Sequence, residues 1–495
     1  MNYFANRYCQ HTRLLTIGAI ICGYFLTPLI LTILLSGCLP ISGTEKGFTR
    51  PLATIEQDAF NSARLNCFLN LKDDKGPAIR LEVSSIEILA DNLRLPLISR
   101  PLKIDSTVIG TGQILLAGMP LPPGRYHRLF LTVTKAEVQK DDGKYIVLAQ
   151  EPFTVEVDLA SGIALEEDDS DTLLITWDLQ SSLLADNSLV PDLTASPSLR
   201  QIPHNLVYVS CPDINTVFVV RADKNWVVDS FGLKGGPTSL AITPDTRQLL
   251  YVLASRDKMI KVVELSTFRI INFFPVPLND APTFMTISPD GQAAFLLDEK
   301  NGYLSRISLT TGQIIARSLL GHRPQYAAFL YDQNLLAVSL SLSQEVLLLD
   351  PVSLQVTSTI HTGSGPQGMT VSGNQLFIAE YGDNSVSIVD LANKASQSRL
   401  TVGFGPSRLL EAGNQIYVSN YHEGSLSVLL PGQLGVIQEI YDLGRPLEMA
   451  YDPSYFRLYI ADEERGELAI IDTNSNRLMG HIFLGARPHD LEIIQ

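Results

Sequence analysis

A repeat of 40 to 45 residues is the feature that most constrains the fold of this 495-residue chain. Turns that end in proline mark the repeat, and the steps between successive prolines are 45, 42, 42, 40, 40 and 42 residues. A period of this length is typical of the four-stranded blades of a β-propeller. The repeating prolines are Pro237, Pro282, Pro324, Pro366, Pro406, Pro446 and Pro488.

Each repeat unit has the same contents. A short strand follows the proline, a tight turn leads to a second strand such as Gln375–Ala379, and a polar turn leads to a third such as Ser385–Asp390. A fourth strand completes the unit. The strands are rich in Val, Ile, Leu and Tyr, and no helical 3.6-residue period interrupts them. The pattern therefore predicts an all-β fold.

The two ends of the repeat region complement each other. The last residues supply only one strand, Asp490–Ile494, whereas residues 205–233 supply three. One strand plus three makes a seventh blade, which closes the ring and removes exposed sheet edges. We therefore predict a seven-bladed β-propeller over residues 205–495.

Several strands of the repeat resemble the YVTN family of propeller repeats, named for a Tyr-Val-Thr-Asn strand. The nearest matches are Tyr417-Val418-Ser419-Asn420 and Tyr208-Val209-Ser210. The resemblance covers about residues 205–495 and implies the propeller fold. YVTN propellers are similar to lactonases, to haem-d1-binding propellers and to surface-layer proteins, so the resemblance leaves the function open.

Residues 61–180 predict a small antiparallel β-sandwich, because short alternating segments are separated by frequent turns. Residues 39–60 are expected to be a tether and residues 181–204 a linker, from their Gly, Ser, Asn and Pro content. The stretch Leu121–Tyr126, with the strand Leu129–Val133 after it, resembles a small uncharacterised domain of bacterial lipoproteins. That resemblance implies no activity.

The N-terminus has the features of an export signal. Arg7 and Arg13 precede an apolar run, Leu14–Leu35, which ends in Leu35-Ser36-Gly37-Cys38. This ending resembles the bacterial lipobox, which implies that residues 1–38 are a signal peptide or anchor helix and that Cys38 carries the lipid. A transmembrane helix is the alternative, since the run is long enough to span a bilayer.

Both interpretations place residues 39–495 outside the cytoplasm. Leu39 follows the cysteine, and by resemblance to Gram-negative lipoproteins this favours the outer membrane. In an oxidising compartment Cys67 and Cys211 are candidates for a disulfide between the two domains; two separately buried thiols are the alternative.

The charge pattern excludes one class of partner. The formal net charge is −15 and no basic stripe is present, so the chain is not expected to bind nucleic acid. The membrane, reached through the lipid at Cys38, and an envelope protein or polymer are the expected partners.

Residues beside the repeating prolines are expected at the mouth of the propeller channel. Arginines and a histidine at this rim, together with His322, suit a carboxylate or a phosphate. Solvated loop residues are the alternative. The candidate binding residues are Arg323, Arg445, Arg487, His489, Gln325 and Gln367.

Motifs for catalysis are missing from the sequence. It has no HExxH, CxxCH or Gly-rich phosphate loop, and only Glu448 and Asp490 are acids near the starts of the innermost strands. We therefore expect no catalytic residues, no metal and no cofactor, and favour a lipid-anchored scaffold over an enzyme. The alternative is a lactonase-like hydrolase or a small-ligand binder that uses the channel mouth.

Overall fold

The computed structural model describes residues 62–73, 75–140, 142–149, 151–184, 188–197, 205–243, 249–276, 280–321, 323–394 and 397–494. The predicted signal segment with Cys38, the tether and His322 lie outside these residues. Within the described ranges, no helix is long and apolar enough to cross a membrane.

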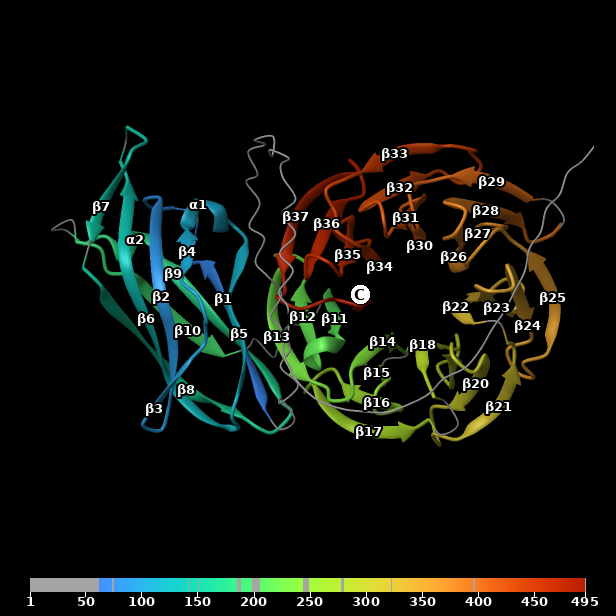
Figure 1. Cartoon of the computed structure of the whole chain (residues 1–495), viewed down its shortest axis with the longest axis horizontal. Helices are drawn as coiled ribbons and strands as arrows, with labels where there is room; N and C mark the ends of the chain where they lie inside the picture. Colours follow the sequence, from blue (N-terminus) through green and yellow to red (C-terminus); the bar gives the residue numbers. More distant parts are fainter. Residues whose placement is uncertain are drawn as a thin grey trace, which may run out of the picture. The chain divides into compact units, whose positions relative to one another are not determined.

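Residues 206–494 form seven four-stranded antiparallel sheets arranged around an axis, so the predicted all-β propeller fold is confirmed (Figure 1). We number these sheets as blades 1 to 7. Blade 1 holds β13 (Trp226–Gly232), β12 (Thr216–Arg221), β11 (Leu206–Cys211) and β38 (Asp490–Ile494), with the 3-10 turn Pro212–Ile214 between β11 and β12.

The other six blades follow in chain order, each running from its innermost to its outermost strand. Blades 2 and 3 hold β14 (Pro237–Ile242), β15 (Leu249–Ala254), β16 (Met259–Glu264) and β17 (Arg269–Pro275), then β18 (Pro282–Ile287), β19 (Ala293–Asp298), β20 (Tyr303–Ser308) and β21 (Ile314–Leu319). Blades 4 and 5 hold β22 (Pro324–Leu330), β23 (Leu335–Leu340), β24 (Glu345–Leu349) and β25 (Val356–His361), then β26 (Pro366–Ser372), β27 (Gln375–Glu380), β28 (Ser385–Asp390) and β29 (Gln397–Thr401). Blades 6 and 7 hold β30 (Pro406–Ala412), β31 (Gln415–Asn420), β32 (Ser425–Leu429) and β33 (Val436–Ile440), then β34 (Pro446–Asp452), β35 (Arg457–Asp462), β36 (Glu467–Asp472) and β37 (Arg477–Phe483).

The last strand closes the ring as the sequence predicts. β38 runs antiparallel to β11, with Ile494 opposite Leu206 and Asp490 opposite Ser210. This pairing joins the two ends of the propeller in one sheet, so blade 1 needs no other element to complete it.

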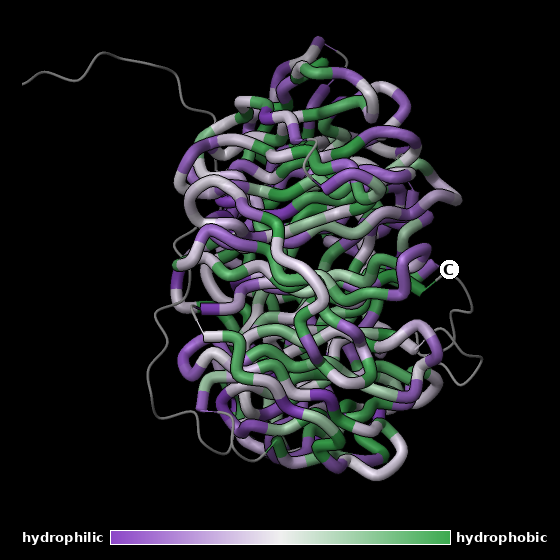
Figure 2. The backbone as a smooth tube through the Cα atoms, turned by 90° about the vertical axis from the view of Figure 1, so that its right-hand side faces the viewer, coloured by the Kyte–Doolittle hydropathy of each residue, from purple (hydrophilic) through white to green (hydrophobic). Residues whose placement is uncertain are grey.

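Hydrophobic residues of neighbouring blades pack together between the sheets. Tyr417 of blade 6, for example, shares one core with Leu458 and Ile471 of blade 7. In Figure 2 the hydrophobic segments run through the interior and many hydrophilic residues lie at the turns. Each innermost strand that begins with a repeating proline has a bulge directly after it, because proline has no N–H for the ladder.

The preceding domain is a sandwich of two sheets. One has the order β10 (Asp192–Pro197), β9 (Ser170–Asp178), β1 (Ala63–Leu71) and β5 (Gln113–Leu121). The other contains β3 (Leu93–Pro96), β2 (Ile79–Ala90), β6 (Gly124–Gln139) and β7 (Tyr145–Ala149), with β4 (Leu102–Asp105) on β2 and β8 (Phe153–Leu165) on β6. Two short helices, α1 (Ser106–Ile109) and α2 (Leu179–Ser182), connect strands.

Two details of this domain differ from the sequence prediction. The first sheet is mixed rather than antiparallel, because β1 and β9 run parallel, with Cys67 opposite Leu173. Part of the predicted linker is strand β10, which pairs with β9 and places Leu193 and Ala195 against the sandwich core. The turn-forming residues around β10 concealed its two apolar positions.

The sandwich and blade 1 share a hydrophobic cluster. Phe68, Leu115 and Leu174 of the sandwich pack with Phe218 and Val220 of blade 1. Polar contacts add to it, since the side-chain amide of Asn66 donates to Ser170 and Ser230, each at 3.1 Å. All three side chains are buried, which favours a fixed contact between the sandwich and blade 1.

The proposed disulfide is not formed. Cys67 belongs to the sandwich core and Cys211 to the cluster shared with blade 1, and both thiols are free and buried. Burial raises the pKa of Cys67 to about 12. The cysteines are therefore the separately buried pair that the alternative interpretation described.

Candidate functional site: the propeller channel

The innermost strands of the seven blades line a cavity of about 750 Å³. No residue of the proline turns, and no residue directly after a repeating proline, lines it. The cavity begins at the second residue after the prolines, as at Ser239, and extends past the other ends of the strands to Asp332, Gln333 and Gly373. It therefore lies deeper, and further from the proline turns, than the sequence suggested.

Carboxylates give this cavity its character. Its lining includes no Lys, Arg or His among the described residues. The acids come from blades 1, 4, 6 and 7, so the ring brings together residues that are far apart in sequence. The lining carboxylates are Asp332, Glu411, Glu448, Asp490 and Glu492.

Asp490 joins blade 1 to blade 2. Its carboxylate accepts the backbone N–H of Leu240 at 2.7 Å and of Leu491 at 2.8 Å. Burial, and then the charge of Glu448, nevertheless raise the pKa of Asp490 to about 7. The desolvation cost thus exceeds the stabilisation from two backbone donors, and the carboxyl group retains a proton over much of the range below neutrality.

Glu492 lies two residues further along β38 and lines the same cavity. Burial raises its pKa well above the ordinary value, and the charges of Asp490 and Glu448 raise it further. The negative charge of Glu448 therefore disfavours charge on both Asp490 and Glu492, and the charge of Asp490 disfavours charge on Glu492.

One arginine partly compensates these acids. Arg408 of blade 6 pairs with Glu448 of blade 7, with Nε 2.8 Å from Oε2, and its guanidinium carbon lies 5.2 Å from the centre of the Tyr326 ring. Gly368 of blade 5 lies against blade 6, where an added Cβ would be 2.8 Å from the Cα of Arg408. This glycine lets the backbones of β26 and β30 approach closely beside Arg408.

No group of three or more His, Cys, Asp or Glu side chains in the described part of the chain converges as metal ligands do. A cavity with several carboxylates and a single arginine beside one of them favours a positively charged ligand, which would displace protons from Asp490 and Glu492.

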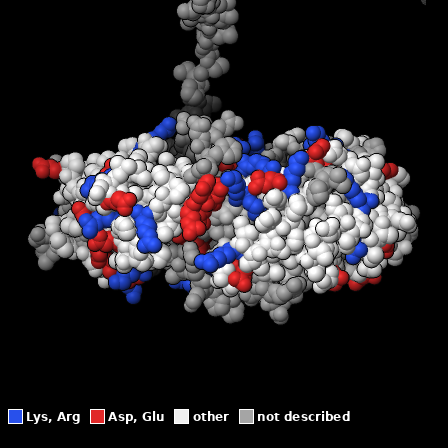
Figure 3. Space-filling model, turned by 90° about the horizontal axis from the view of Figure 1, so that it is seen from below, with Lys and Arg blue, Asp and Glu red and all other residues white. Residues whose placement is uncertain are grey.

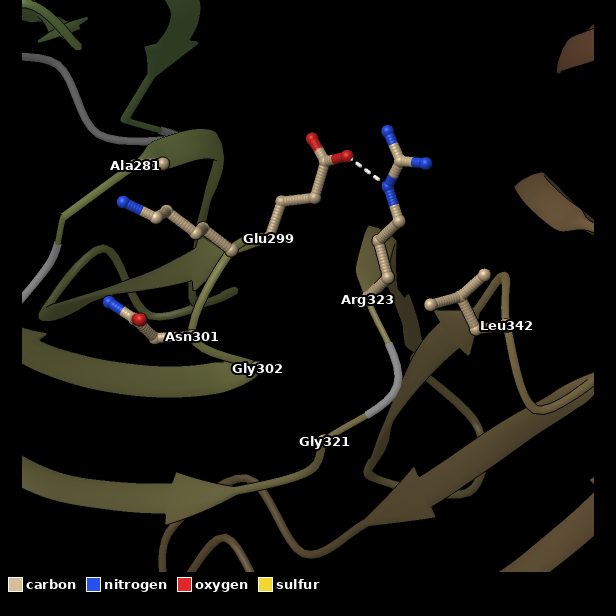
Figure 4. A pocket seen from close by; sticks show the side chains of 8 residues that line it. Ala281, Glu299, Asn301, Gly302, Gly321, Arg323 and Leu342 are labelled. Atoms are coloured by element: carbon tan, nitrogen blue, oxygen red, sulfur yellow. Dashed lines mark hydrogen bonds and ion pairs between the residues drawn. The ribbon is translucent and has the colours of Figure 1, made fainter. Parts of the chain in front are cut away.

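The predicted arginines lie on the proline-turn rim, each beside an acid. Arg323 is exposed and pairs with Glu299 of blade 3 beside a surface cavity of 590 Å³ (Figure 4). Arg487 has its Nε 3.8 Å from an oxygen of Asp213.

Arg445 is paired in the same way, with Nε 3.6 Å from an oxygen of Glu464. Figure 3 likewise shows basic and acidic side chains next to one another over one face of the molecule. The rim arginines are therefore compensated surface charges, as the alternative interpretation described.

The other predicted residues do not join them. Burial, and then the charge of Arg408, lower the pKa of His489, so this side chain is neutral near pH 7 and adds no positive charge for an anion. Gln325 and Gln367 are partly buried at the starts of β22 and β26, outside the cavity lining. The structure does not bring the six predicted residues together in one site.

The residues that the sequence prediction missed, Tyr326, Arg408 and Glu492, carry a readable signal that Glu448 and Asp490 share. Tyr326, Arg408, Glu448 and Asp490 each lie two positions after a repeating proline. Glu492 lies two positions further, on the same side of its strand. Aligning the repeats on their prolines and reading alternate positions would have pointed to Tyr326, Glu448, Asp490 and Glu492 in the cavity lining, and to Arg408 beside it.

Comparison with known proteins supports the fold and leaves the site unassigned. No family model matches the chain, and no curated protein matches it. A functionally unknown protein from Desulfotomaculum acetoxidans is similar, with 19% identity and a TM-score of 0.53 over 59% of this chain and 99% of that one. A protein from Lactobacillus plantarum is 16% identical, with a TM-score of 0.51 over 59% of this chain and 100% of that one.

A third solved structure carries a functional description. It is a putative 6-phosphogluconolactonase from Bacteroides fragilis, 12% identical, with a TM-score of 0.51 over 59% of this chain and 98% of that one. At these identities the likeness shows the fold alone. The propeller fold hosts many activities, so the function must be argued from the site.

Proposed function

We propose that this protein is an envelope binding protein that takes a positively charged organic ligand, such as a polyamine, into its propeller channel. One observation carries the proposal: five carboxylates and no cationic side chain line a cavity of 750 Å³ within the described residues. Two of these acids, Asp490 and Glu492, lie close enough to Glu448 for its charge to disfavour theirs. A bound ammonium group would relieve that repulsion.

The lipid anchor belongs to the same proposal. The Leu35-Ser36-Gly37-Cys38 sequence at the end of an apolar run supports acylation of Cys38 and retention outside the cytoplasm. The buried contacts between Asn66, Ser170 and Ser230 support a sandwich that holds the propeller in a fixed orientation. Labelling with palmitate tests the anchor: label should enter the wild type and not Cys38→Ala, and equal labelling would refute it.

A second candidate function is a scaffold that binds an envelope protein or polymer on the proline-turn rim. An aromatic cluster supports it. Phe404, which is 57% exposed, lies 5.5 Å from the ring of His422, and His422 lies 5.3 Å from Tyr381. Exposed aromatic rings with polar neighbours are typical of contact surfaces.

Calorimetric titration of the whole chain with putrescine and spermidine tests the channel. We expect binding by the wild type and an affinity weakened about tenfold or more in Glu492→Gln, which keeps the shape of the side chain and removes its charge. Glu464→Gln is the matched control, because it removes one carboxylate from the rim beside Arg445. Absence of binding, or equal losses in the two variants, would contradict the proposal.

A further inference from the structure

Blades 5 and 6 differ at one set of equivalent positions. In blade 5 the second strand ends at Glu380, and Ser387 of the third strand lies opposite Arg399 of the outer strand. In blade 6 the second strand ends at Asn420, and Ser427 lies opposite Glu439. The acid Glu380 and the base Arg399 of blade 5 are thus replaced in blade 6 by an amide and an acid.

The blade 5 positions form a compensated group. Glu380 has no exposed side-chain surface, and its Oε2 lies 2.8 Å from Nε of Arg399. A second carboxylate, Asp383 of the β27–β28 turn, lies 3.6 Å from Nη1 of the same arginine. One guanidinium therefore faces two carboxylates.

The blade 6 positions hold two carboxylates without a cation. Glu423 takes the place of Asp383 in its turn, and Glu439 takes the place of Arg399. Ser425 donates to Glu423 at 2.9 Å and Ser427 donates to Glu439 at 2.8 Å. No Lys, Arg or His of the described residues makes an ion pair with either glutamate.

Asn420 supplies a second, separate observation. Its side chain is fully buried, and its amide nitrogen donates to Ser427 at 2.8 Å and to Ser425 at 2.9 Å. The amide head is thus held between the two serines that bind the carboxylates. Its Oδ1, like Oε2 of Glu439, is buried and accepts no hydrogen bond from the described residues. Buried oxygens without a donor are costly and rare in native proteins.

We propose that these side chains of blade 6 bind a divalent cation, Ca²⁺, through Oδ1 of Asn420 and the carboxylates of Glu423 and Glu439. The donors are all oxygen atoms, two of them anionic, which is the ligand chemistry that Ca²⁺ takes. The cation occupies the role that Arg399 fills in blade 5. The site is independent of the channel and of any ligand bound there.

Equilibrium dialysis of the whole chain against ⁴⁵Ca²⁺ tests the site, with thermal unfolding as a second readout. We expect the wild type to bind Ca²⁺ with a Kd of about 10⁻⁴ to 10⁻³ M or lower and to gain thermal stability from it. Glu439→Gln should weaken binding about tenfold or more. The channel variant Glu492→Gln should bind Ca²⁺ as the wild type does, so failure of the channel proposal leaves this result unaffected.

A double variant that introduces the blade 5 residue types into blade 6 keeps the proposal testable if a single variant fails to fold. The double variant Asn420→Glu with Glu439→Arg restores a guanidinium opposite an acid, and we expect it to fold without Ca²⁺ and to show no Ca²⁺-dependent rise in Tm. Absence of Ca²⁺ binding by the wild type would overturn the proposal. Undiminished binding by Glu439→Gln would overturn it as well.

Discussion

The proline-turn rim and the channel of this propeller are built from the same repeats, yet their charged side chains differ in how they are paired. On the rim, Arg323 and Arg445 each lie beside an acid, and both arginines are about half exposed. In the channel, Glu448 pairs with Arg408, and the neighbouring acids Asp490 and Glu492 make no ion pair with a described residue. Exposed pairs contribute little to stability, whereas buried uncompensated charges cost stability. This difference supports the proposal that the channel binds a charged ligand.

Removing one arginine from each region should give the largest difference in stability between the channel and the rim. Arg408→Met leaves Glu448 largely buried beside two other acids, so we expect a loss of about 3 kcal/mol in the free energy of unfolding. Arg445→Met on the rim should cost less than about 1 kcal/mol. Urea unfolding monitored by Trp fluorescence measures both values, and equal losses would break the comparison.

The pH dependence of stability should depend on Asp490. Its pKa is about 7 in the folded chain against an ordinary value of 3.8, so between these values the folded state holds a proton that the unfolded state has lost. Its contribution to stability is therefore complete at low pH and is lost as the pH rises toward 7, by up to about 1.4 kcal/mol per pH unit.

Asp490→Asn should flatten this part of the profile. Unfolding free energies measured between about pH 4 and pH 8 would show the change. A rim variant, Asp213→Asn, is the control and should retain the wild-type slope. If Asp490→Asn kept that slope, the carboxyl group would not hold the proton assigned to it.

Replacing Glu492 should change stability in the opposite direction to the removal of Arg408. Glu492→Gln removes a buried carboxyl group whose pKa is raised by burial. We expect it to gain about 1 kcal/mol in unfolding free energy at about pH 8 while losing affinity for cationic ligands. A destabilised variant would show that the carboxylate contributes to folding rather than to binding.

The smallest effect is expected on the rim. Arg323→Gln removes one member of a pair with Glu299 whose arginine side chain is 55% exposed. Its unfolding free energy should change by less than about 0.5 kcal/mol, and its affinity for putrescine should stay at the wild-type value. A loss of affinity comparable with that of Glu492→Gln would indicate that the binding site lies on the rim.

The fold was predictable because its evidence is local and repeated. Evenly spaced prolines and strand-like runs recur in every blade, and the single strand at Asp490–Ile494 implies the closure that β38 makes with β11. The parallel pairing of β1 with β9 was not predictable in this way. It joins segments about 100 residues apart, and nothing in either strand specifies the other's direction.

The site was predictable only in part. The sequence prediction placed Glu448 and Asp490 near the inner strands, whereas it missed Glu492 and Arg408. Which alternate residues face the axis depends on the bulge after each proline, and the span of that bulge differs between blades. Arg323, Arg445 and Arg487 carried the clearest chemical pattern, but the acids that pair with them lie on other turns, 19 to 274 residues away.

Proton release on ligand binding tests most directly whether the channel carboxylates receive a cation. Calorimetric titrations of the whole chain with putrescine, in two buffers of different ionisation enthalpy at about pH 7, give the number of protons released. We predict net release, which disappears in the Asp490→Asn, Glu492→Gln double variant. Binding that releases no protons, or release that persists in the double variant, would contradict the proposed role of the channel.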